Sequence, residues 1–446
     1  MKIVHDVNTM VKPEKVRRAG YTPASVELGR RGLHTRESIL QSAARLFLDR
    51  GFHGTSIDAV AKAAGASRAT IYQYFQDKDE IYGELAAQCV PAMLEHAARL
   101  GPLGPDATGI QNLYEWLDQW TTLYDDHAVV LLAFPGFGFS TGIAAAPDSV
   151  SDRYLASVTD RTRQAGVEGI APEDAAAAVV RIAHVVNLYR YRGMWGLPDA
   201  HTVTASLTVA LQSLLFPGTP PAVRDLFRVP TDPPPAATRV PRAVASVPVS
   251  APSASPIRSD IVAAAASLFA EHGYYAVGMD EIGAAAGISR ATLYRHFRTK
   301  VAILSELTQA ALVEGAGLAA DLHELAYQSF SRKSLHAWLR HYVGFHRRYE
   351  SVTQTWYDGG LNKQLADAIS TGLGPFQEAA TVLLIRSGLP EGIDLRVGAA
   401  IFLAVLGRLT ELTISRRTAD TDYDSADLML VVLSRALSMS FDTELS

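Results

Sequence analysis

Apolar residues recur at intervals of three and four along most of this chain, which is the spacing of one face of an α-helix. In the first half the clearest stretches are Leu113–Leu123, Ala175–Trp195 and Val203–Phe216. In the second half they are Leu335–Tyr349, Phe376–Ile385, Val397–Ile414 and Leu428–Leu437. Alternation with period two, which marks a half-buried strand, is scarce. The pattern therefore predicts an all-α fold.

The helical pattern breaks at residues 217–256, which hold 11 of the chain's 22 prolines. Because proline lacks a backbone donor and clashes inside a helix, we expect a semi-extended linker there. Residues 1–34 carry seven Lys or Arg and three Asp or Glu, which predicts a disordered basic arm. The alternative for this arm is contact with DNA phosphates or the minor groove. The remaining chain divides into domains at 35–82, 83–216, 257–304 and 305–446.

Residues 35–81 and 257–303 match without a gap at an offset of 222, with identical residues at 19 of 47 positions. In the first copy an apolar helix ends at Gly51, and a short second helix leads to a turn at Gly65. Ser67 then stands where it can cap a third helix. This layout is typical of a helix-turn-helix unit, and the chain holds it twice.

The third helix of each copy has an apolar back and a polar front. In the first copy Ile71 and Phe75 lie four apart and face the core. The outward residues are Arg68, Thr70, Gln73 and Tyr74 in the first copy, and Arg290, Thr292, Arg295 and His296 in the second. Such a face suits readout of a DNA groove and contact with phosphates. The alternative is a helical scaffold that does not bind DNA, and salt-dependent binding separates the two.

The run G-x-S-R-A-T-[IL]-Y-x-[YH]-F-x-x-K, present in both copies, resembles the DNA-binding domain of the tetracycline-repressor (TetR) family over residues 35–82 and 257–304. The resemblance implies a three-helix DNA-binding domain in each half, followed by a helical domain for ligand binding and dimerisation. It also implies a sequence-specific transcriptional regulator, usually a repressor relieved by a small apolar effector, and no enzyme activity.

The same resemblance assigns roles by position. Arg68, Thr70 and Gln73 would contact bases, and Tyr72, Tyr74, Lys78 and Thr55 would contact phosphates. Thr55 would also cap the second helix. The corresponding residues of the second unit are Arg290, Thr292, Tyr294, Arg295, His296 and Lys300.

The two units differ at positions that bear on DNA contact. Thr55-Ser56 of the first unit is Val277-Gly278 in the second, which removes the capping hydroxyl. Gln73 can pair with adenine, whereas its counterpart Arg295 favours guanine. We therefore expect an operator whose half-sites differ under these residues. A second possibility is that the second unit supplies mainly non-specific grip.

In the resembling family, two helices of the regulatory domain form the dimer interface. The expected counterparts are 172–193 and 199–216, then 392–414 and 424–440. A covalent pseudo-dimer would pair these two sets within one chain. The competing arrangement is a homodimer with four DNA-binding units. Two reading heads already match a two-fold operator, which favours the first.

Aromatic residues cluster in both regulatory domains and suggest a pocket for a small apolar effector. The candidate residues are Trp116, Trp120, Phe137, His184, Asn187, Trp338, His341, Tyr342, Phe345 and Trp356. For any single one of them, a place in the core is the simpler interpretation, because aromatic residues at helical spacing usually pack inside.

The composition of the chain limits the kinds of protein and of site that we expect. The net charge of −5 means that any DNA contact must come from local geometry. The single cysteine, Cys89, rules out an internal disulfide and fits the cytoplasm, and we find no leader or apolar run that predicts a membrane span. No Cys/His cluster has zinc spacing, and no cofactor is expected.

One motif favours an enzyme. Gly138-Phe139-Ser140-Thr141-Gly142 matches the G-x-S-x-G pattern of a hydrolase nucleophile, with Ser140 as the nucleophile. The pattern needs a strand, a turn and a helix in a parallel sheet, whereas the neighbouring segments are predicted helices. A serine hydrolase is therefore the disfavoured alternative.

Overall fold

The computed structural model describes residues 30–132, 147–230, 255–328, 330–353, 355, 359–410 and 421–441. Helices and their connections make up this described part, and no strand occurs in it. The all-α prediction is confirmed. The Ser140 motif lies outside the described residues, and the described ranges offer no strand for the sheet that it requires. The chain forms two compact units, Met1–Glu84 and Leu85–Ser446.

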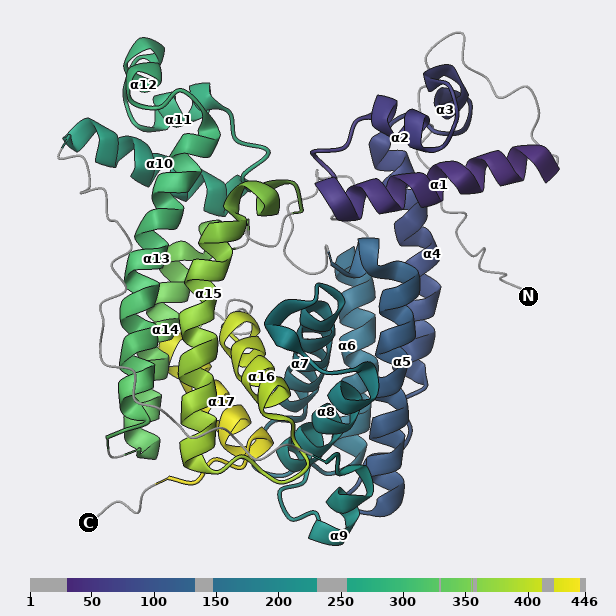
Figure 1. Cartoon of the computed structure of the whole chain (residues 1–446), viewed down its shortest axis with the longest axis vertical. Coiled ribbons are helices and arrows are strands. Elements are labelled where there is room, and N and C mark those ends of the chain that lie inside the picture. The colour runs from purple at the N-terminus through teal and green to yellow at the C-terminus, as the bar shows by residue number, and fades with distance from the viewer. Residues whose placement is uncertain are drawn as a thin grey trace, which may run out of the picture. The chain divides into compact units, whose positions relative to one another are not determined.

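The first unit is a small helical domain with one apolar core (Figure 1). It contains α1 (Arg30–Arg50), α2 (Ile57–Ala63), α3 (Arg68–Tyr74) and the start of α4 (Lys78–Ala98). The residues that fill its core are Ile39, Ala43, Phe47, Val60, Ile71, Phe75 and Ile81. Because α1 begins at Arg30, residues 30–34 extend this helix and do not belong to the predicted disordered arm. The rest of that arm lies outside the described residues.

The second unit holds the remaining helices. Those before the proline-rich segment are α5 (Ala107–Leu131), α6 (Pro147–Gln164), α7 (Pro172–Tyr191), η1 (Met194–Gly196), α8 (Ala200–Leu215), α9 (Pro221–Arg224) and η2 (Asp225–Phe227). Those after it are α10 (Pro256–His272), α11 (Met279–Ala285), α12 (Arg290–His296), α13 (Lys300–Leu325), α14 (Arg332–Thr353), α15 (Gly359–Ser387), α16 (Leu395–Arg408) and α17 (Thr421–Ala436).

The repeat extends beyond the stretch in which identities reveal it. Helices α11, α12 and α13 begin 222 residues after α2, α3 and α4. Helices α16 and α17 begin within one residue of the same offset from α7 and α8. The regulatory domains, 83–216 and 305–446, therefore share one architecture although few of their residues are identical.

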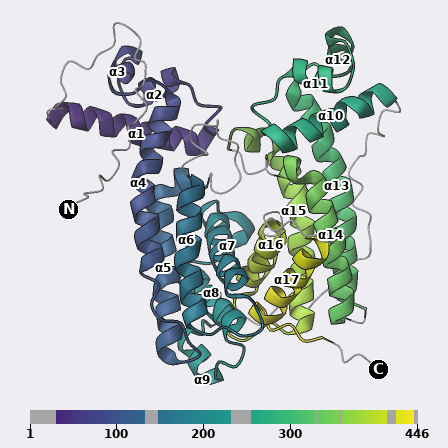
Figure 2. The ribbon, with the colours of Figure 1, turned by 180° about the vertical axis from the view of Figure 1, so that it is seen from behind.

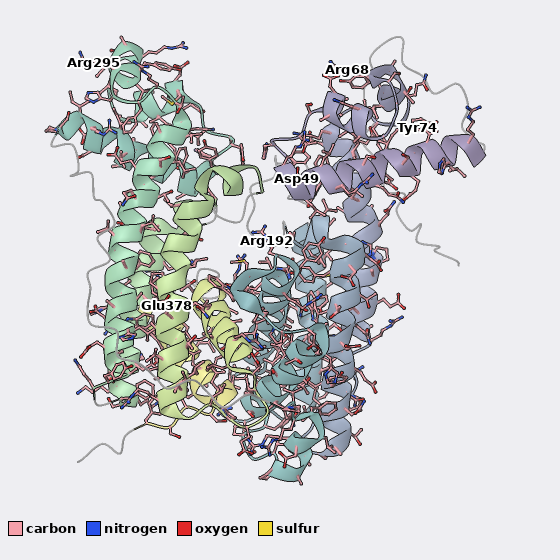
Figure 3. All side chains as sticks on the ribbon, in the orientation of Figure 1. Asp49, Arg68, Tyr74, Arg192, Arg295 and Glu378 are labelled. Atoms are coloured by element: carbon pink, nitrogen blue, oxygen red, sulfur yellow. The ribbon has the colours of Figure 1, made fainter. Side chains whose placement is uncertain are left out.

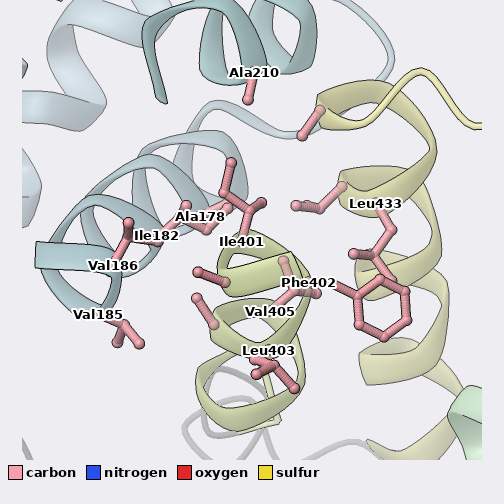
Figure 4. Packing of buried hydrophobic residues seen from close by; sticks show 14 of the residues in the cluster. Ala178, Ile182, Val185, Val186, Ala210, Ile401, Phe402, Leu403, Val405 and Leu433 are labelled. Atoms are coloured by element: carbon pink, nitrogen blue, oxygen red, sulfur yellow. The ribbon is translucent and has the colours of Figure 1, made fainter. Parts of the chain in front are cut away.

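Within the second unit, α7 and α8 pack against α16 and α17, as the views from both sides show (Figures 1 and 2). Ala178, Ile182 and Val186 of α7 lie opposite Ile401 and Val405 of α16 (Figure 4), and all five are buried. Small side chains such as Ala178 let the two backbones approach closely. The four helices are those expected at 172–193, 199–216, 392–414 and 424–440.

Hydrogen bonds hold the two ends of α16 to α7 and α8. The Arg181 guanidinium donates to the carbonyl oxygen of Arg408 at 2.9 Å. The backbone N–H of Asp394 donates to the Ser206 hydroxyl at 3.1 Å. These bonds fix the register in which the apolar faces meet.

The chain remains folded past the expected start of the linker. Thr219 accepts a hydrogen bond from the Gln212 amide at 2.9 Å. Phe227 stacks on Tyr114 of α5 with ring centroids 4.6 Å apart. Packing onto the first regulatory domain thus continues at least to Val229, which is buried. Of the predicted linker, residues 231–254 lie outside the described ranges.

One helix of the described part, α13, is long and apolar enough to meet the criteria for a membrane span. Its buried residues include Leu304 and Leu307 in the core of the second DNA-binding unit and Leu322 in the core of the regulatory domains. Because α13 links two cores in this way, its apolar composition is explained by packing.

Candidate nucleic-acid interface

The third helix of each helix-turn-helix unit starts as the sequence predicts. Ser67 accepts a hydrogen bond from the backbone N–H of Thr70 at 3.0 Å, and Ser289 does the same for Thr292 at 3.2 Å. The turns before them place Gly65 and Gly287 at φ of 64° and 67°, a left-handed conformation that glycine adopts without strain. Each cap fixes the direction in which the third helix leaves the turn.

On the front of α3, Arg68 is held between two side chains. Its guanidinium lies 3.4 Å from the Asp58 carboxylate and donates to the Tyr72 hydroxyl at 3.2 Å. The pKa of Arg68 is raised, first by the bond to Tyr72 and then by the charge of Asp58. The Arg68 side chain is 60% exposed, so it remains accessible while its position is restricted.

The second helix-turn-helix unit has the same arrangement on α12. Arg290 lies 3.3 Å from the Asp280 carboxylate and 5.5 Å from the ring centroid of Tyr294. Asp58 and Asp280, which stand 222 residues apart, were not among the predicted site residues. Their identity in the two copies was the available signal. A carboxylate beside DNA would be repelled by the phosphates. Here each carboxylate is paired with an arginine.

The other predicted front residues differ in exposure. Gln73 and Arg295 are exposed, whereas Tyr74 and His296 are half-buried. Figure 3 shows Arg68 and Tyr74 on α3 and Arg295 on α12. The Thr70 hydroxyl lies 2.8 Å from that of Ser67, and the Thr292 hydroxyl lies 3.0 Å from that of Ser289. These threonines therefore contribute to the helix caps, whatever their contacts with DNA.

Lys78 binds backbone carbonyl groups within its own helix-turn-helix unit. Its Nζ donates to the carbonyl oxygens of Phe52 at 2.5 Å and Thr55 at 3.1 Å, and lies 4.3 Å from the Phe52 ring centroid. Burial lowers the pKa of Lys78. The ammonium group therefore ties the segment between α1 and α2 to the start of α4.

Lys300 makes the equivalent bonds in the second helix-turn-helix unit. Its Nζ donates to the carbonyl oxygens of Tyr274 at 2.6 Å and Val277 at 2.7 Å. Burial lowers its pKa as well. Each ammonium group is thus bound to backbone carbonyls, and a phosphate contact by either lysine stays a prediction.

Thr55 does not cap α2, contrary to expectation. Its side chain is buried, and its hydroxyl donates to the Gly51 carbonyl at 2.8 Å. The cap is Ser56, which accepts from the backbone N–H of Ala59 at 3.2 Å. A buried hydroxyl bound to α1 cannot reach a phosphate in this conformation.

In the second helix-turn-helix unit the start of α11 has no hydroxyl cap. Instead, the Glu281 carboxylate accepts from the backbone N–H of Gly278 at 2.6 Å. This bond satisfies one of the donors at the start of the helix. The predicted loss of the capping hydroxyl is therefore partly offset.

A second arginine in each unit supports the recognition helix from behind. Arg36 pairs with Glu84 at 3.0 Å, with its guanidinium 5.2 Å from the Phe75 ring centroid. In the other unit Arg258 bonds Glu306 at 2.8 Å and donates to the carbonyl oxygen of His296 at 2.9 Å. The latter bond anchors the last residue of α12.

The aromatic candidates of the first regulatory domain converge around α5. Trp116 and Trp120 are at most 1% exposed, and His184 lies 5.8 Å from Trp120 between ring centroids. His96 and Tyr154, which were not predicted, complete the cluster. Asn187 is buried, and its amide donates to the Ala183 carbonyl within α7.

In the second regulatory domain Trp338, Tyr342 and Phe345 are buried together on α14. His341 is exposed on the same helix, so it does not join this cluster. Phe137 and Trp356 lie outside the described residues. Within the described ranges, no group of three or more His, Cys, Asp or Glu side chains is placed to hold a metal ion.

The comparisons agree with this geometry. The sequence model of bacterial regulatory proteins, tetR family, matches residues 39–85 and 261–307. The transcriptional regulator AcrR of Shigella flexneri is 45% identical over 51 residues, covering 11% of this chain and 24% of that protein. The transcriptional repressor AcnR of Corynebacterium efficiens is 31% identical over 77 residues, covering 17% of this chain and 41% of that protein.

Among solved structures, a TetR/AcrR-family regulator from Thermobifida fusca aligns with 40% of this chain and 97% of its own, at 21% identity and a TM-score of 0.31. The chain matches less than half the length of AcrR and of AcnR. The family model falls on the two helix-turn-helix units with their capped third helices. Each half of the chain thus carries one domain that matches the tetR family of bacterial regulatory proteins.

Proposed function

We propose that this protein is a transcriptional regulator that binds double-stranded operator DNA through both of its helix-turn-helix units. The observation that carries the proposal is the exposed arginine that begins each third helix, Arg68 or Arg290, held by a carboxylate from the helix before it. A positioned, exposed guanidinium suits contact with a base edge in the major groove.

The packing of α7 and α8 on α16 and α17 supports a single chain acting as a covalent pseudo-dimer. A two-fold operator needs two reading heads in a fixed relation, and dimeric regulators obtain them from two subunits. Here the four-helix interface lies within one polypeptide. One chain per operator is therefore the expected stoichiometry.

The reading heads of this pseudo-dimer are not equivalent. Gln73 in the first is replaced by Arg295 in the second, and both side chains are exposed. An operator with adenine under Gln73 and guanine under Arg295 fits these side chains. The expected action is repression in the cytoplasm, relieved by a small effector that binds the DNA-incompetent state more tightly.

Single-head variants test the proposal. Arg68→Ala and Arg290→Ala should each weaken binding to the selected operator by about 1–3 kcal/mol, which is roughly 5- to 150-fold. Exposed Arg340→Ala on α14, outside both heads, is the matched control and should bind as the parent does. Binding measured by fluorescence anisotropy should also weaken steeply with salt. Unchanged affinity in both head variants would contradict DNA readout by these helices.

A further inference from the structure

The two regulatory domains place aromatic rings at corresponding positions, although some of the residues differ. At the offset of 222, Trp116 corresponds to Trp338 and Trp120 to Tyr342. Tyr154 corresponds to Phe376 in the same way. In each domain these three rings are in one buried cluster, with the first two on the long helix α5 or α14. The two aromatic clusters can therefore be compared position by position within one chain.

Hydrogen bonding separates the two clusters. The Trp338 indole N–H donates to the Leu318 carbonyl oxygen at 2.9 Å. The indole N–H groups of Trp116 and Trp120 are buried and have no acceptor in the described part of the chain. An indole N–H is a donor only, and leaving one buried without a partner costs about 1–3 kcal/mol.

At the position of Leu318 the first domain has His96. His96 Nε2 lies 2.9 Å from the Trp116 carbonyl oxygen, and Nδ1 lies 2.7 Å from the Tyr154 hydroxyl. Because the carbonyl can only accept, Nε2 carries the proton and Nδ1 accepts from Tyr154. Burial lowers the pKa of His96 to about 4, so the ring is neutral at pH 7.

Other polar groups lie beside the same cluster. The Tyr124 hydroxyl donates to the His184 carbonyl oxygen at 3.0 Å and lies 3.1 Å from His184 Nδ1. The second domain has His346 and Leu406 at these two positions. Nε and Nη2 of Arg190 are buried without an acceptor in the described part of the chain. The charge of Arg190 acts on Tyr124. Unsatisfied donors and positive charge both favour a ligand that presents oxygen acceptors.

We infer that the first regulatory domain alone binds the effector, one molecule per chain. The ligand class is an apolar ring compound with a carbonyl or similar oxygen that accepts from the Trp116 and Trp120 indoles. The second domain, whose Trp338 is already satisfied, is a packed support. This inference rests on the proposed function only in giving the ligand a regulatory role. Ligand binding itself can be measured without DNA.

The test uses the full chain labelled with 5-fluorotryptophan, whose ¹⁹F signals are assigned from single Trp→Phe variants. The probe is 1-tetralone, and its matched control is the hydrocarbon tetralin, which has the same ring system without the oxygen. We expect 1-tetralone to shift the Trp116 and Trp120 signals to saturation at one molecule per chain while the Trp338 signal stays in place. Tetralin should bind at least about fivefold more weakly, the size of one hydrogen bond.

Variants separate binding from folding. Trp120→Phe should weaken 1-tetralone binding about five- to tenfold, because it removes an N–H that has no acceptor in the described part of the chain. Trp338→Phe should leave binding unchanged. Both variants shrink a buried ring, and Trp338→Phe should lower the melting temperature more, because it also breaks a formed bond. Two molecules per chain, equal binding of tetralin, or no shift with 1-tetralone at its solubility limit would overturn the inference.

The same samples are titrated with operator DNA. Ligand binding without DNA binding would remove the proposed function and leave the ligand site in place. DNA binding without the ligand shifts would do the reverse.

Discussion

The Lys78 ammonium group and the Phe52 carbonyl oxygen, 26 residues apart in sequence, lie 2.5 Å from each other. Lys300 and Tyr274 repeat this relationship at 2.6 Å in the second unit. The bond joins the segment that follows α1 to the start of α4. A lysine that seemed placed for DNA thus stabilises the domain that carries the reading face.

Lys78→Met should therefore reduce stability and leave the electrostatics of DNA binding unchanged. Two buried carbonyl groups lose their donor, which costs on the order of 1–3 kcal/mol. Thermal melting measures the first effect, and the slope of log affinity against log salt measures the second. A lost phosphate contact would instead reduce that slope by about one and leave the melting temperature as it was.

A second prediction concerns the carboxylate beside Arg68. Asp58→Asn removes an exposed ion pair, so its effect on stability should be below about 1 kcal/mol. The freed arginine is less well positioned, and the DNA face loses a negative charge. We expect affinity for random DNA to rise and the ratio of operator to random binding to fall.

Competition with random duplex DNA gives this ratio. Asp280→Asn is the matched change at the second head and should act in the same direction. Equal changes in operator and random affinity would show that the carboxylate acts only through its charge.

Much of this architecture follows from the sequence, because it rests on local signals. Gly65 and Ser67 define the turn and the cap, and the apolar spacing of α5, α7 and α8 defines the helices. The roles of Lys78 and Thr55 could not be predicted in this way. Both depend on carbonyl groups that folding brings close, and a hydroxyl or ammonium group carries no local sign of its partner.

The extent of the repeat was also hidden. Beyond residue 81 the two halves keep their spacing and few identities: Trp116 is matched by Trp338, whereas Tyr154 is replaced by Phe376. Packing preserves helix length and the position of buried rings, whereas the chemistry at each position can change. The polar cluster around His96 is visible only when the structure aligns it with Leu318.

The buried state of His96 gives a third prediction. Its pKa is about 4 in the folded protein and about 6.5 when unfolded, so the unfolded chain binds more protons between these values. Stability must then fall as pH falls through this window. Between about pH 7.5 and about pH 5 the loss from this residue should be roughly 2 kcal/mol.

Urea unfolding at the two pH values measures this loss. The variant His96→Leu, which copies the second domain, should reduce the pH dependence by the same amount. An equal pH dependence in parent and variant would show that His96 is not the group responsible.

A fourth prediction addresses the interface between α7 and α16. Ile401 is fully buried against α7 residues, so Ile401→Ala should cost about 2–5 kcal/mol. Arg435→Ala removes only an exposed hydrogen bond to the Glu168 carbonyl and should cost less than about 1.5 kcal/mol. Operator affinity should fall with Ile401→Ala and not with Arg435→Ala, because the proposed pseudo-dimer depends on the packing of α7 on α16. Denaturant unfolding and anisotropy together check both effects.

In the proposed function one chain reads one operator with two non-identical heads. Selection of bound sequences from a random DNA pool by the full chain measures this preference. We expect a single site with two half-sites that differ under Gln73 and Arg295, with adenine favoured at the first and guanine at the second. We further expect that Gln73→Arg makes the selected half-sites alike. A symmetric site selected by the parent chain, or one with four half-sites, would contradict this proposal.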